Sequence, residues 1–421
     1  MQKTDQPITD ISYVSKINKT KIINLIRDKE TISRSEIAKE IGLSLPTVSR
    51  LVDSLVQKEK LLIEVGTRTT ERGRPPSLVT FAGKQNYVIG MSVGRNHISG
   101  ILTNLNAEVL AEDKVPTNAA SGYQSVVRRC ASQVQKLIQD AGVSETNVLG
   151  VGVASGGLID TRRSRIIFSA TLNWREKDLA ADLNGLINKP VKVDHDARVM
   201  ALGEIQFGLG QNLRDFICVL LGYGIGASFI FEGKPYYGKS GMTGEFGHIV
   251  VSEKSQVQCS CGNRGCLEAL ASGRAIALQA LKEMSNLKSP ILEKLCDYDP
   301  LQLSAETVAI AASQGDEISR RILLDAAEHI GIGLATLVNL YNPEMIILGG
   351  GLVKAGDLLF DRIRAVVKER TLSRICQDVT IQPSLMGNRC RIMGAVALIL
   401  NEILSLNIPA YANDSVAEDY I

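Results

Sequence analysis

The segment CSCGNRGCLE, residues 259–268, places three cysteines and a glutamate within ten positions. Thiols this close together can form a disulfide, act as a redox pair or bind a metal ion. The other five cysteines are scattered singly, mostly among apolar residues, where a thiol packs as a small hydrophobe. Because a cytoplasmic protein keeps its thiols reduced, we interpret the clustered cysteines as metal ligands rather than disulfide partners.

Length and composition limit the classes of protein to be considered. A chain of 421 residues predicts two or three domains, and 45% hydrophobic with 22% charged residues is typical of a soluble globular protein. The net charge of +2 excludes a uniformly basic nucleic-acid coat. The first residues lack the apolar core of a secretion signal, and no apolar run of about 18 residues is present. We therefore expect a cytoplasmic protein without membrane insertion.

A local surplus of positive charge marks residues 16–76, which hold 13 lysines and arginines against 8 acids. Within this region, residues 18–30 space apolar side chains for one buried helix face. Ser33 and Glu36 are placed as a capping box for a second helix. Gly42 then makes a turn into a further helix, SLPTVSRLVDSLVQKEKL. Two short helices joined by a glycine turn are typical of a helix-turn-helix.

The second helix of this motif, which begins near Leu45, should enter the major groove with its first turns near base edges. LLIEVG and SLVTFAG predict two wing strands around a loop of arginines that can follow the phosphate backbone or enter the minor groove. The alternative is a small helical bundle with solvated charges, and the basic wing makes DNA binding the favoured interpretation. The predicted DNA-contacting residues are Arg34, Pro46, Thr47, Ser49, Arg50, Arg68, Arg72 and Arg74.

From about Tyr87 onward, strands alternate with helices, and glycine turns follow several strands. VLGVGVASGGLID, KPVKVDHDARVMALGE and PEMIILGGG each predict a buried strand with a turn or a helix at its carboxyl end. This alternation predicts an α/β fold with ligand groups at the strand ends. Two glycine hairpins about 130 residues apart suggest two related lobes with a cleft between them. Such turns can bring backbone N–H groups to phosphates, although tight strand turns use glycine in any case.

Taken together, these residues resemble the ROK family of repressors, open reading frames and sugar kinases, and the resemblance covers nearly the whole chain. The most specific match is GEFGHIVV followed by CSCGNRGCLE. With its helix-turn-helix, the chain is similar to the sugar-responsive NagC/XylR-type repressors. The implied fold class is α/β, with an N-terminal winged helix-turn-helix (1–82) followed by a two-lobed, actin-like sugar-kinase fold. Lobe I spans 83–197 with a C-terminal helix at about 391–405 returning to it, and lobe II with a zinc knot spans 198–390.

The resemblance implies one structural Zn²⁺ bound by His248, Cys259, Cys261 and Cys266. Three thiolates and an imidazole form a closed tetrahedral site that leaves no position for catalysis. Reduced core thiols or a CxC redox pair are the alternatives, and no nearby motif supports redox chemistry.

The resemblance also implies a sugar site. Glu245 and Glu268 match carboxylates that accept hydrogen bonds from sugar hydroxyls, although a lone glutamate of this kind is otherwise a helix cap or an exposed acid. DHDA is similar to the family's catalytic Asn-Asp-Ala, with His195 in the Asn place and Asp196 matching the base. The predicted sugar-binding residues are Ser155, Gly156, His195, Asp196, Glu245, His248 and Glu268.

The kinase chemistry is where the sequence departs from the family. The phosphate hairpin of the family reads like IGVDIGGTK, and here residues 89–97 read IGMSVGRNH. Ser92 replaces an aspartate that helps to manage the metal-bound nucleotide, and Arg95 and Asn96 replace the Gly-Thr that contacts phosphate. We therefore expect a cleft without kinase activity, in which Asp196 is a vestigial base.

Two functions from different classes follow. The first is a transcriptional repressor of sugar-metabolism genes that binds pseudo-palindromic operator DNA as a homodimer or homotetramer, and whose operator affinity changes when a sugar or sugar phosphate enters the cleft. The second is an ATP-dependent hexose or N-acetylhexosamine kinase that carries a DNA-binding domain. A sugar-transport protein as partner is a further possibility that no sequence feature marks.

Overall fold

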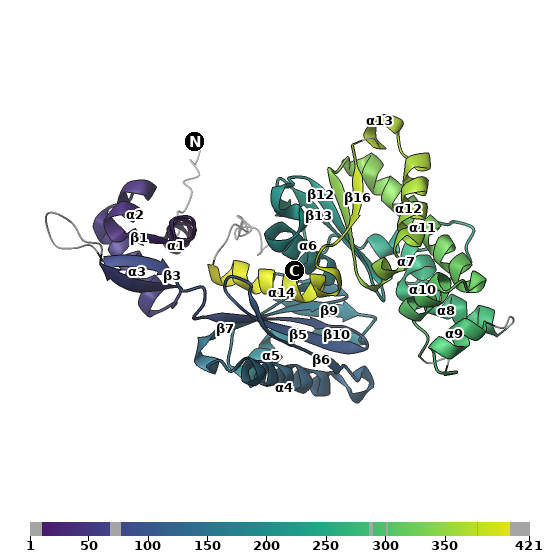
Figure 1. Cartoon of the computed structure of the whole chain (residues 1–421), viewed down its shortest axis with the longest axis horizontal. Coiled ribbons are helices and arrows are strands. Elements are labelled where there is room, and N and C mark those ends of the chain that lie inside the picture. Colours follow the sequence, from purple (N-terminus) through teal and green to yellow (C-terminus); the bar gives the residue numbers. More distant parts are fainter. Residues whose placement is uncertain (1–10, 68–76, 286–288, 300–301, 377, 405–421) are drawn as a thin grey trace, which may run out of the picture.

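The structure is a computed structural model, which describes residues 11–67, 77–285, 289–299, 302–376 and 378–404. Figure 1 shows an N-terminal domain at one end, followed by two α/β lobes, with the yellow helix α14 in the middle of the molecule.

The N-terminal domain confirms the predicted winged helix-turn-helix. Ser33 caps the second helix through the predicted box with Glu36, and Gly42 ends that helix at φ 69°. The two wing strands pair antiparallel, and a third short strand joins them in the order β1-β3-β2. The elements are α1 (Ile11–Lys29), β1 (Thr31–Ser33), α2 (Arg34–Ile41), α3 (Leu45–Gln57), β2 (Leu62–Thr67) and β3 (Ser77–Phe81). The wing loop, with the predicted contacts Arg68, Arg72 and Arg74, lies outside the described residues.

Lobe I is built on a five-stranded sheet of order β11-β7-β4-β5-β6. Side chains alternate along β4, so that Ile89, Met91 and Val93 face α4 and α5, whereas Val88 and Gly90 face α14. A small three-stranded sheet, β8 to β10, extends this lobe. The elements are β4 (Tyr87–Val93), β5 (His97–Asn104), β6 (Val109–Pro116), α4 (Tyr123–Ala141), β7 (Val148–Ser155), β8 (Leu158–Asp160), β9 (Arg165–Ser169), β10 (Trp174–Lys177), α5 (Leu179–Ile187) and β11 (Val191–His195).

Lobe II repeats this plan with a five-stranded sheet of order β14-β13-β12-β15-β16. Along β12, Ile217, Val219 and Leu221 join the larger helical core, and Phe216 and Cys218 pack toward α6. The strands are β12 (Phe216–Leu221), β13 (Ile225–Phe231), β14 (Lys234–Pro235), β15 (Met345–Gly349) and β16 (Thr380–Pro383). The helices are α7 (Leu267–Ala271), α8 (Gly273–Met284), α9 (Pro290–Leu295), α10 (Ala305–Ser313), α11 (Glu317–Tyr341), α12 (Asp357–Arg370) and α13 (Ser373–Cys376).

Helix α11 is the one helix among the described residues that is long and apolar enough to cross a membrane. Its apolar face is instead packed into the lobe II core, where Ile322, Ile330 and Leu334 are completely buried. A buried core helix passes the same test of length and composition.

Helices α6 (Asp196–Phe207) and α14 (Cys390–Leu404) lie between the two sheets. The boundary predicted at residue 197 therefore falls inside α6, whose buried residues pack toward both lobes. Helix α14 lies on β4 and β7 of lobe I, as the predicted return of the C-terminal helix requires.

Candidate functional site

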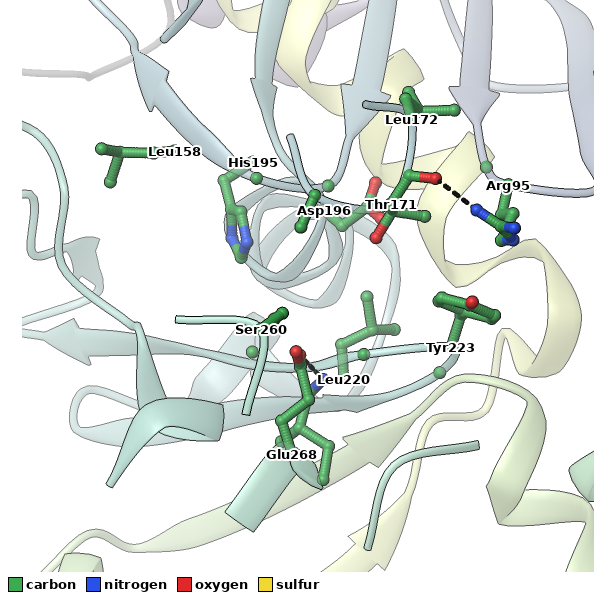
Figure 2. A pocket seen from close by; sticks show the side chains of 18 of the residues that line it. Arg95, Leu158, Thr171, Leu172, His195, Asp196, Leu220, Tyr223, Ser260 and Glu268 are labelled. Atoms are coloured by element: carbon green, nitrogen blue, oxygen red, sulfur yellow. Dashed lines mark hydrogen bonds between the residues drawn. The ribbon is translucent and has the colours of Figure 1, made fainter. Parts of the chain in front are cut away.

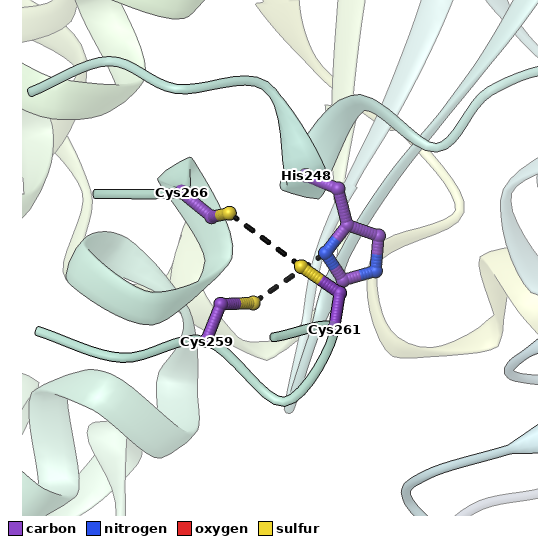
Figure 3. Close-up of side chains that lie close together, drawn as sticks. All are labelled: His248, Cys259, Cys261 and Cys266. Atoms are coloured by element: carbon purple, nitrogen blue, oxygen red, sulfur yellow. Dashed lines mark hydrogen bonds between the residues drawn. The ribbon is translucent and has the colours of Figure 1, made fainter. Parts of the chain in front are cut away.

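The clustered cysteines and His248 converge on one point in lobe II (Figure 3). Their four ligand atoms all lie within 4.8 Å of one another. The Sγ atoms of Cys261 and Cys266 are 3.7 Å apart, and Cys259 Sγ lies 3.5 Å from His248 Nδ1. Bonds of about 2.3 Å to sulfur and about 2.0 Å to nitrogen at tetrahedral angles give about 3.8 Å between two sulfurs and about 3.5 Å between sulfur and nitrogen. The residues therefore fit a four-coordinate metal ion.

The Cys₃His cluster leads directly into the next helix. Gly265 adopts φ 71°, and a Cβ there would lie 2.0 Å from the carbonyl oxygen of Ser252, so only glycine fits this turn. Cys266 is the N-cap of α7, and Glu268 lies in the first turn of that helix. A metal ion bound by Cys266 would thus fix the position of the Glu268 carboxylate.

A cleft of about 520 Å³ opens between the lobes, at the carboxyl ends of β7 and β11 and beside the glycine turn that follows β12. The structure brings six of the seven predicted sugar-binding residues into its walls: Gly156, His195, Asp196, Glu245, His248 and Glu268. Ser155 lies directly before Gly156 at the end of β7, where it is completely buried. Figure 2 shows His195 and Asp196 on one side of the cleft and Ser260 and Glu268 on the other.

Asp196 begins α6 and has a partly unsatisfied carboxylate. Its Oδ2 lies 3.5 Å from Arg391 Nη1, whereas its buried Oδ1 has no hydrogen-bond partner. Burial raises the pKa of Asp196, and the charge of Arg391 opposes this effect. An unpaired buried carboxylate oxygen costs free energy. The Asp196 carboxylate also lines the cleft, where a hydroxyl group can donate to it.

His195, which stands in the place of the family's asparagine, is a neutral imidazole. Burial, followed by the charge of Arg198, lowers the pKa of His195 to about 3. Its Nδ1 has no partner among the described residues, and a neutral ring can donate from one nitrogen and accept at the other. His195 can therefore still hydrogen-bond a polar ligand, as the asparagine would.

The opposite wall carries two glutamates, of which Glu268 is hydrogen-bonded to the backbone and Glu245 is more exposed. Glu268 Oε2 accepts a hydrogen bond of 3.0 Å from the Ile225 amide, so the carboxylate is held against the Gly222–Ala227 turn. Glu245 lies one residue before the 3₁₀ turn Phe246–His248, with 41% of its side chain exposed, and its Oε2 is 3.9 Å from His248 Nε2. Two acceptors on one wall of a closed site can select a ligand by its hydroxyls.

The hairpin between β4 and β5 forms the predicted turn, with Ser92 and Arg95 at the positions where the sequence departs from the family pattern. Gly94 N donates to His97 O at 3.0 Å, which closes the turn, and Ser92 is buried in β4. The Arg95 guanidinium donates to Thr171 O at 3.0 Å and lies 5.4 Å from the ring centroid of Tyr223 in lobe II (Figure 2). Arg95 thus reaches from one glycine hairpin to the other.

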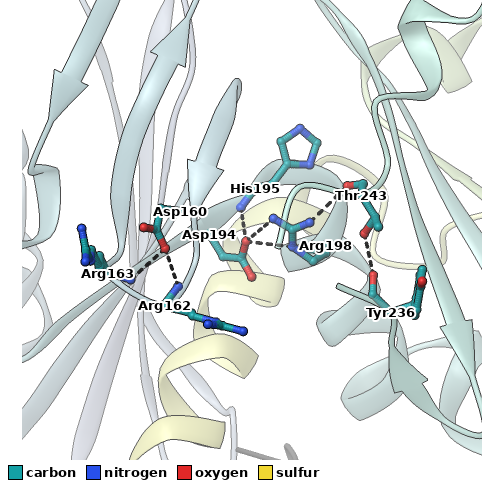
Figure 4. A network of polar contacts seen from close by, with 8 residues as sticks. All are labelled: Asp160, Arg162, Arg163, Asp194, His195, Arg198, Tyr236 and Thr243. Atoms are coloured by element: carbon teal, nitrogen blue, oxygen red, sulfur yellow. Dashed lines mark hydrogen bonds and ion pairs between the residues drawn. The ribbon is translucent and has the colours of Figure 1, made fainter. Parts of the chain in front are cut away.

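A buried polar network holds the base of the cleft together (Figure 4). Arg198 is 2% exposed, pairs with Asp194 at 2.9 Å and donates to the Thr243 carbonyl at 3.2 Å. It therefore joins α6, which carries Asp196, to the loop that leads to Glu245. Sequence reasoning missed Arg198, although the Asp194–Arg198 spacing of i,i+4 was a usable signal.

Three further cleft residues were also missed: Arg175, Tyr223 and Arg391. Arg391 is separated from Asp196 by 195 positions (391 − 196), so no local pattern connects the two. Tyr223 is inside the GYGIGA turn, where the glycines were recognised and the aromatic ring was not.

The predicted DNA-reading residues lie on the first turns of α3. Pro46 and Arg50 are exposed and Thr47 and Ser49 are half-buried, whereas the inward face formed by Val48, Leu51, Val52 and Leu55 is buried as predicted. Arg34 has a different environment, because it lies 2.7 Å from both Asp53 and Glu64 within the same domain.

Comparison with known proteins agrees with this arrangement. The ROK family profile matches residues 88–402, and a winged helix-turn-helix DNA-binding profile matches residues 16–61. The xylose repressor of Caldicellulosiruptor bescii is 31% identical over 402 residues, which cover 95% of this chain and 99% of that protein.

Two solved structures share the fold. A ROK family transcriptional regulator that is a homologue of the Escherichia coli MLC protein superposes with a TM-score of 0.75 at 25% identity, over 93% of this chain and 97% of that one. A ROK family glucokinase from Streptomyces griseus, in complex with glucose and AMPPNP, gives a TM-score of 0.68 at 29% identity, over 74% of this chain and 99% of that one. The chain therefore belongs to the ROK family, and its two lobes follow a winged helix-turn-helix DNA-binding domain.

Proposed function

We propose that this protein is a transcriptional repressor of sugar-metabolism genes whose operator affinity is lowered by a sugar or sugar phosphate bound in the cleft. The observation that carries the proposal is the combination, in one chain, of a DNA-reading helix and a cleft whose hydroxyl-binding groups are present. The similarity to a xylose repressor over 95% of the chain supports it. The proposed sugar contacts are the seven predicted residues, with Ser155 acting from behind Gly156.

The phosphate-side wall supports a regulator without kinase activity. Arg95 occupies the turn in which a kinase needs close backbone approach to phosphate, and Ser92 cannot replace a carboxylate near a metal-bound nucleotide. Asp196 keeps the position of a base, but here it serves as a hydrogen-bond acceptor for the sugar. The similarity to glucokinases keeps the kinase as the alternative to be tested.

The metal ion in this proposal is one structural Zn²⁺ per chain. The residues that would hold it are His248, Cys259, Cys261 and Cys266, and a closed Cys₃His set supplies structural support rather than a reactive water. Its role would be to fix the loop that leads into α7 and the Glu268 carboxylate.

The DNA-bound form would be a homodimer or homotetramer in the cytoplasm that places two α3 helices on a pseudo-palindromic operator. Pro46, Thr47, Ser49 and Arg50 would contact base edges and phosphates, and the wing arginines would contact the backbone. Arg34, which pairs with two acids, would contribute less. The proposal also includes a sugar-transport protein as an additional partner.

A DNA-binding titration tests the proposal directly. Fragments of the gene's own upstream region are titrated at fixed salt, alone and with free and phosphorylated sugars that include D-xylose and D-glucose. Specific binding that one sugar weakens is expected, by about 5- to 150-fold. Arg50→Ala should lose specific binding, with Lys39→Ala, on α2, as the matched control for a lost positive charge.

The same samples distinguish the proposed repressor from the kinase alternative. ATP consumption with the hexose panel, together with no specific DNA binding, would overturn the repressor in favour of the kinase. Tight DNA binding that no sugar changes would replace the sugar effector with a protein partner.

A further inference from the structure

Arg391 lines the cleft, and it belongs to helix α14, whose other end lies away from the cleft. It lies in the first turn of α14, and its Nη1 is 3.5 Å from Asp196 Oδ2. A Cβ on Gly94 would lie 3.8 Å from the same Nη1, so the guanidinium is beside the hairpin between β4 and β5 as well. Its side chain is 37% exposed, which leaves it accessible to a ligand in the cleft.

Helix α14 is pressed directly onto the backbone of lobe I. A Cβ on Gly90 would lie 2.2 Å from the Ile392 carbonyl oxygen, and one on Gly152 would lie 2.0 Å from that of Ala395. On its other side, a Cβ on Gly394 would lie 2.0 Å from the Val199 carbonyl oxygen of α6. With backbone against backbone at these points, a displacement at one end of α14 is transmitted along the helix and to the strands and the helix α6 that it touches.

The other end of α14 shares a core with the DNA-binding domain. Leu400 and Leu404 are completely buried in the one apolar cluster that also contains the inward face of α3. At the junction between the domain and lobe I, this cluster includes Leu61, Leu62, Val79, Val88 and Leu105. Figure 1 shows α14 between the N-terminal domain and lobe II.

Polar contacts fix the same junction. The buried Asn86 side chain donates to the Lys60 carbonyl at 2.6 Å, and Ala82 N donates to Leu61 O at 2.9 Å. Leu105 N donates to Gly83 O at 2.9 Å. The N-terminal domain is therefore joined to lobe I by a packed and hydrogen-bonded junction at the end of α14, rather than by a free linker.

We propose that Arg391 is an effector-sensing residue that couples the cleft, through α14, to the orientation of the DNA-reading helix. The inference rests on the proposed function. In the sugar-free protein the Arg391–Asp196 pair holds the amino end of α14 against α6. A sugar hydroxyl that donates to Asp196 weakens this pair, the amino end of α14 shifts, and the shared core transmits the shift to the junction. Both sites bias one rigid element, which is the physical requirement for coupling.

The test is the variant Arg391→Gln, which removes the charge and keeps most of the side-chain length. Without sugar, its operator affinity should already be at least fivefold weaker than that of the wild-type protein, and the further effect of sugar should be less than twofold. Because coupling is reciprocal, the variant should also bind the effective sugar more tightly, by a similar factor. Calorimetry with D-xylose and D-glucose, free and phosphorylated, measures the second effect.

Two matched arginines control for the loss of charge. Arg389→Gln removes an arginine two positions away that pairs with Glu112 outside the cleft, at 2.7 Å. Arg175→Gln removes an arginine that lines the same cleft from β10 rather than from α14. Arg389→Gln should keep the wild-type ratio of operator affinities with and without sugar. Arg175→Gln should change only the sugar concentration at which that ratio is reached.

A double-mutant cycle in the absence of sugar makes the result independent of the ligand. Asp196→Asn and Arg391→Gln should each weaken operator binding, and the double variant should be no weaker than either single variant. Additive effects, or wild-type operator affinity in Arg391→Gln with unchanged melting temperature, would overturn the inference while leaving the proposed function intact. If the wild-type protein binds its operator but no sugar releases it, the proposed effector fails, and the cycle still decides whether Arg391 is coupled to the DNA-reading helix.

Discussion

The two walls of the cleft differ in how much of the family's chemistry they keep. The lobe II wall carries the Cys₃His cluster that fits a metal ion and both glutamates, with Glu268 held by the Ile225 amide. The lobe I hairpin retains its backbone turn, closed by the Gly94–His97 hydrogen bond, but carries Ser92 and Arg95 in place of nucleotide-binding residues. The fold requires the turn, because β4 and β5 must be connected, whereas only phosphoryl transfer requires the lost side chains.

This difference separates structural from chemical constraints within one cleft. If the whole cleft had lost its function, the unpaired oxygen of Asp196 and the fixed Glu268 carboxylate would make the free energy of folding less favourable and serve no purpose. Under the proposed function, these two acceptors lie on opposite walls of the cleft and bind a ligand that needs no nucleotide. The following experiments change one wall at a time.

The largest effect is expected from removing the metal ligands of the lobe II wall. Cys259→Ser combined with Cys261→Ser should abolish stoichiometric zinc and cost roughly 3 kcal/mol of folding free energy, because metal binding is coupled to folding. For a lobe of about 200 residues this corresponds to a fall of about 6–12 °C in Tm. Zinc content by mass spectrometry and calorimetric melting measure both effects. Cys130→Ala, which alters a buried thiol outside the cluster, should keep the zinc; equal zinc content in both proteins would refute the assignment.

The next effect concerns the sugar. Glu268→Ala should weaken sugar binding by about 10- to 150-fold, since a hydrogen bond to a charged group contributes about 1.5–3 kcal/mol. Operator affinity without sugar should be retained. Glu268→Gln is the matched variant, because its amide oxygen can still accept from Ile225 N and preserve the turn. A full sugar response in Glu268→Ala would show that this carboxylate is not a ligand contact.

Local patterns in the sequence predicted the elements that carry the site, and the distant contacts required the fold. The Ser33–Glu36 cap and the strand-to-helix step at DHDA are set by neighbours a few residues apart, and both are found in the structure. The clustered cysteines suggested metal ligands from their spacing, and the family resemblance added His248; the structure brings these four side chains together. By contrast, the contacts of Arg95 with Tyr223 and of Arg391 with Asp196 depend on how two lobes meet. No local sequence pattern encodes how the two lobes pack against each other.

A third experiment rebuilds the lobe I wall. The triple variant Ser92→Asp, Arg95→Gly and Asn96→Thr restores the family hairpin and removes the bridge from Arg95 to Tyr223. Binding of AMPPNP should become measurable at about millimolar concentration, equivalent to about 4 kcal/mol, and the wild-type protein should show none. Sugar affinity should change less than threefold, because Asp196, Glu245 and Glu268 are untouched. Calorimetry with each ligand tests both statements, and a tenfold loss of sugar binding would mean that the two walls do not act separately.

The smallest effect is the dependence of sugar binding on pH. Burial raises the pKa of Asp196, although Arg391 opposes the effect, so this carboxylate is protonated at a higher pH than an ordinary aspartate at about 3.9. A sugar hydroxyl that donates to Asp196 binds the ionised form, so sugar affinity should fall as the pH is lowered from 7.5 to 5. His195 does not contribute, because its pKa of about 3 keeps it neutral throughout this range.

The lobe II wall can titrate as well, and the two contributions must be separated. Desolvation also raises the pKa of Glu245, but the Glu245 side chain is 41% exposed, whereas that of Asp196 is 12% exposed. Asp196→Asn should therefore remove most of the decline in sugar affinity between pH 7.5 and 5, whereas Glu245→Gln should leave most of it. The reverse outcome would place the principal acceptor on the lobe II wall and reduce Asp196 to a partner of Arg391. In that case sugar binding would affect α14 only through the residues that link the two walls. The most direct of these is Arg198, which pairs with Asp194 and donates to the Thr243 carbonyl.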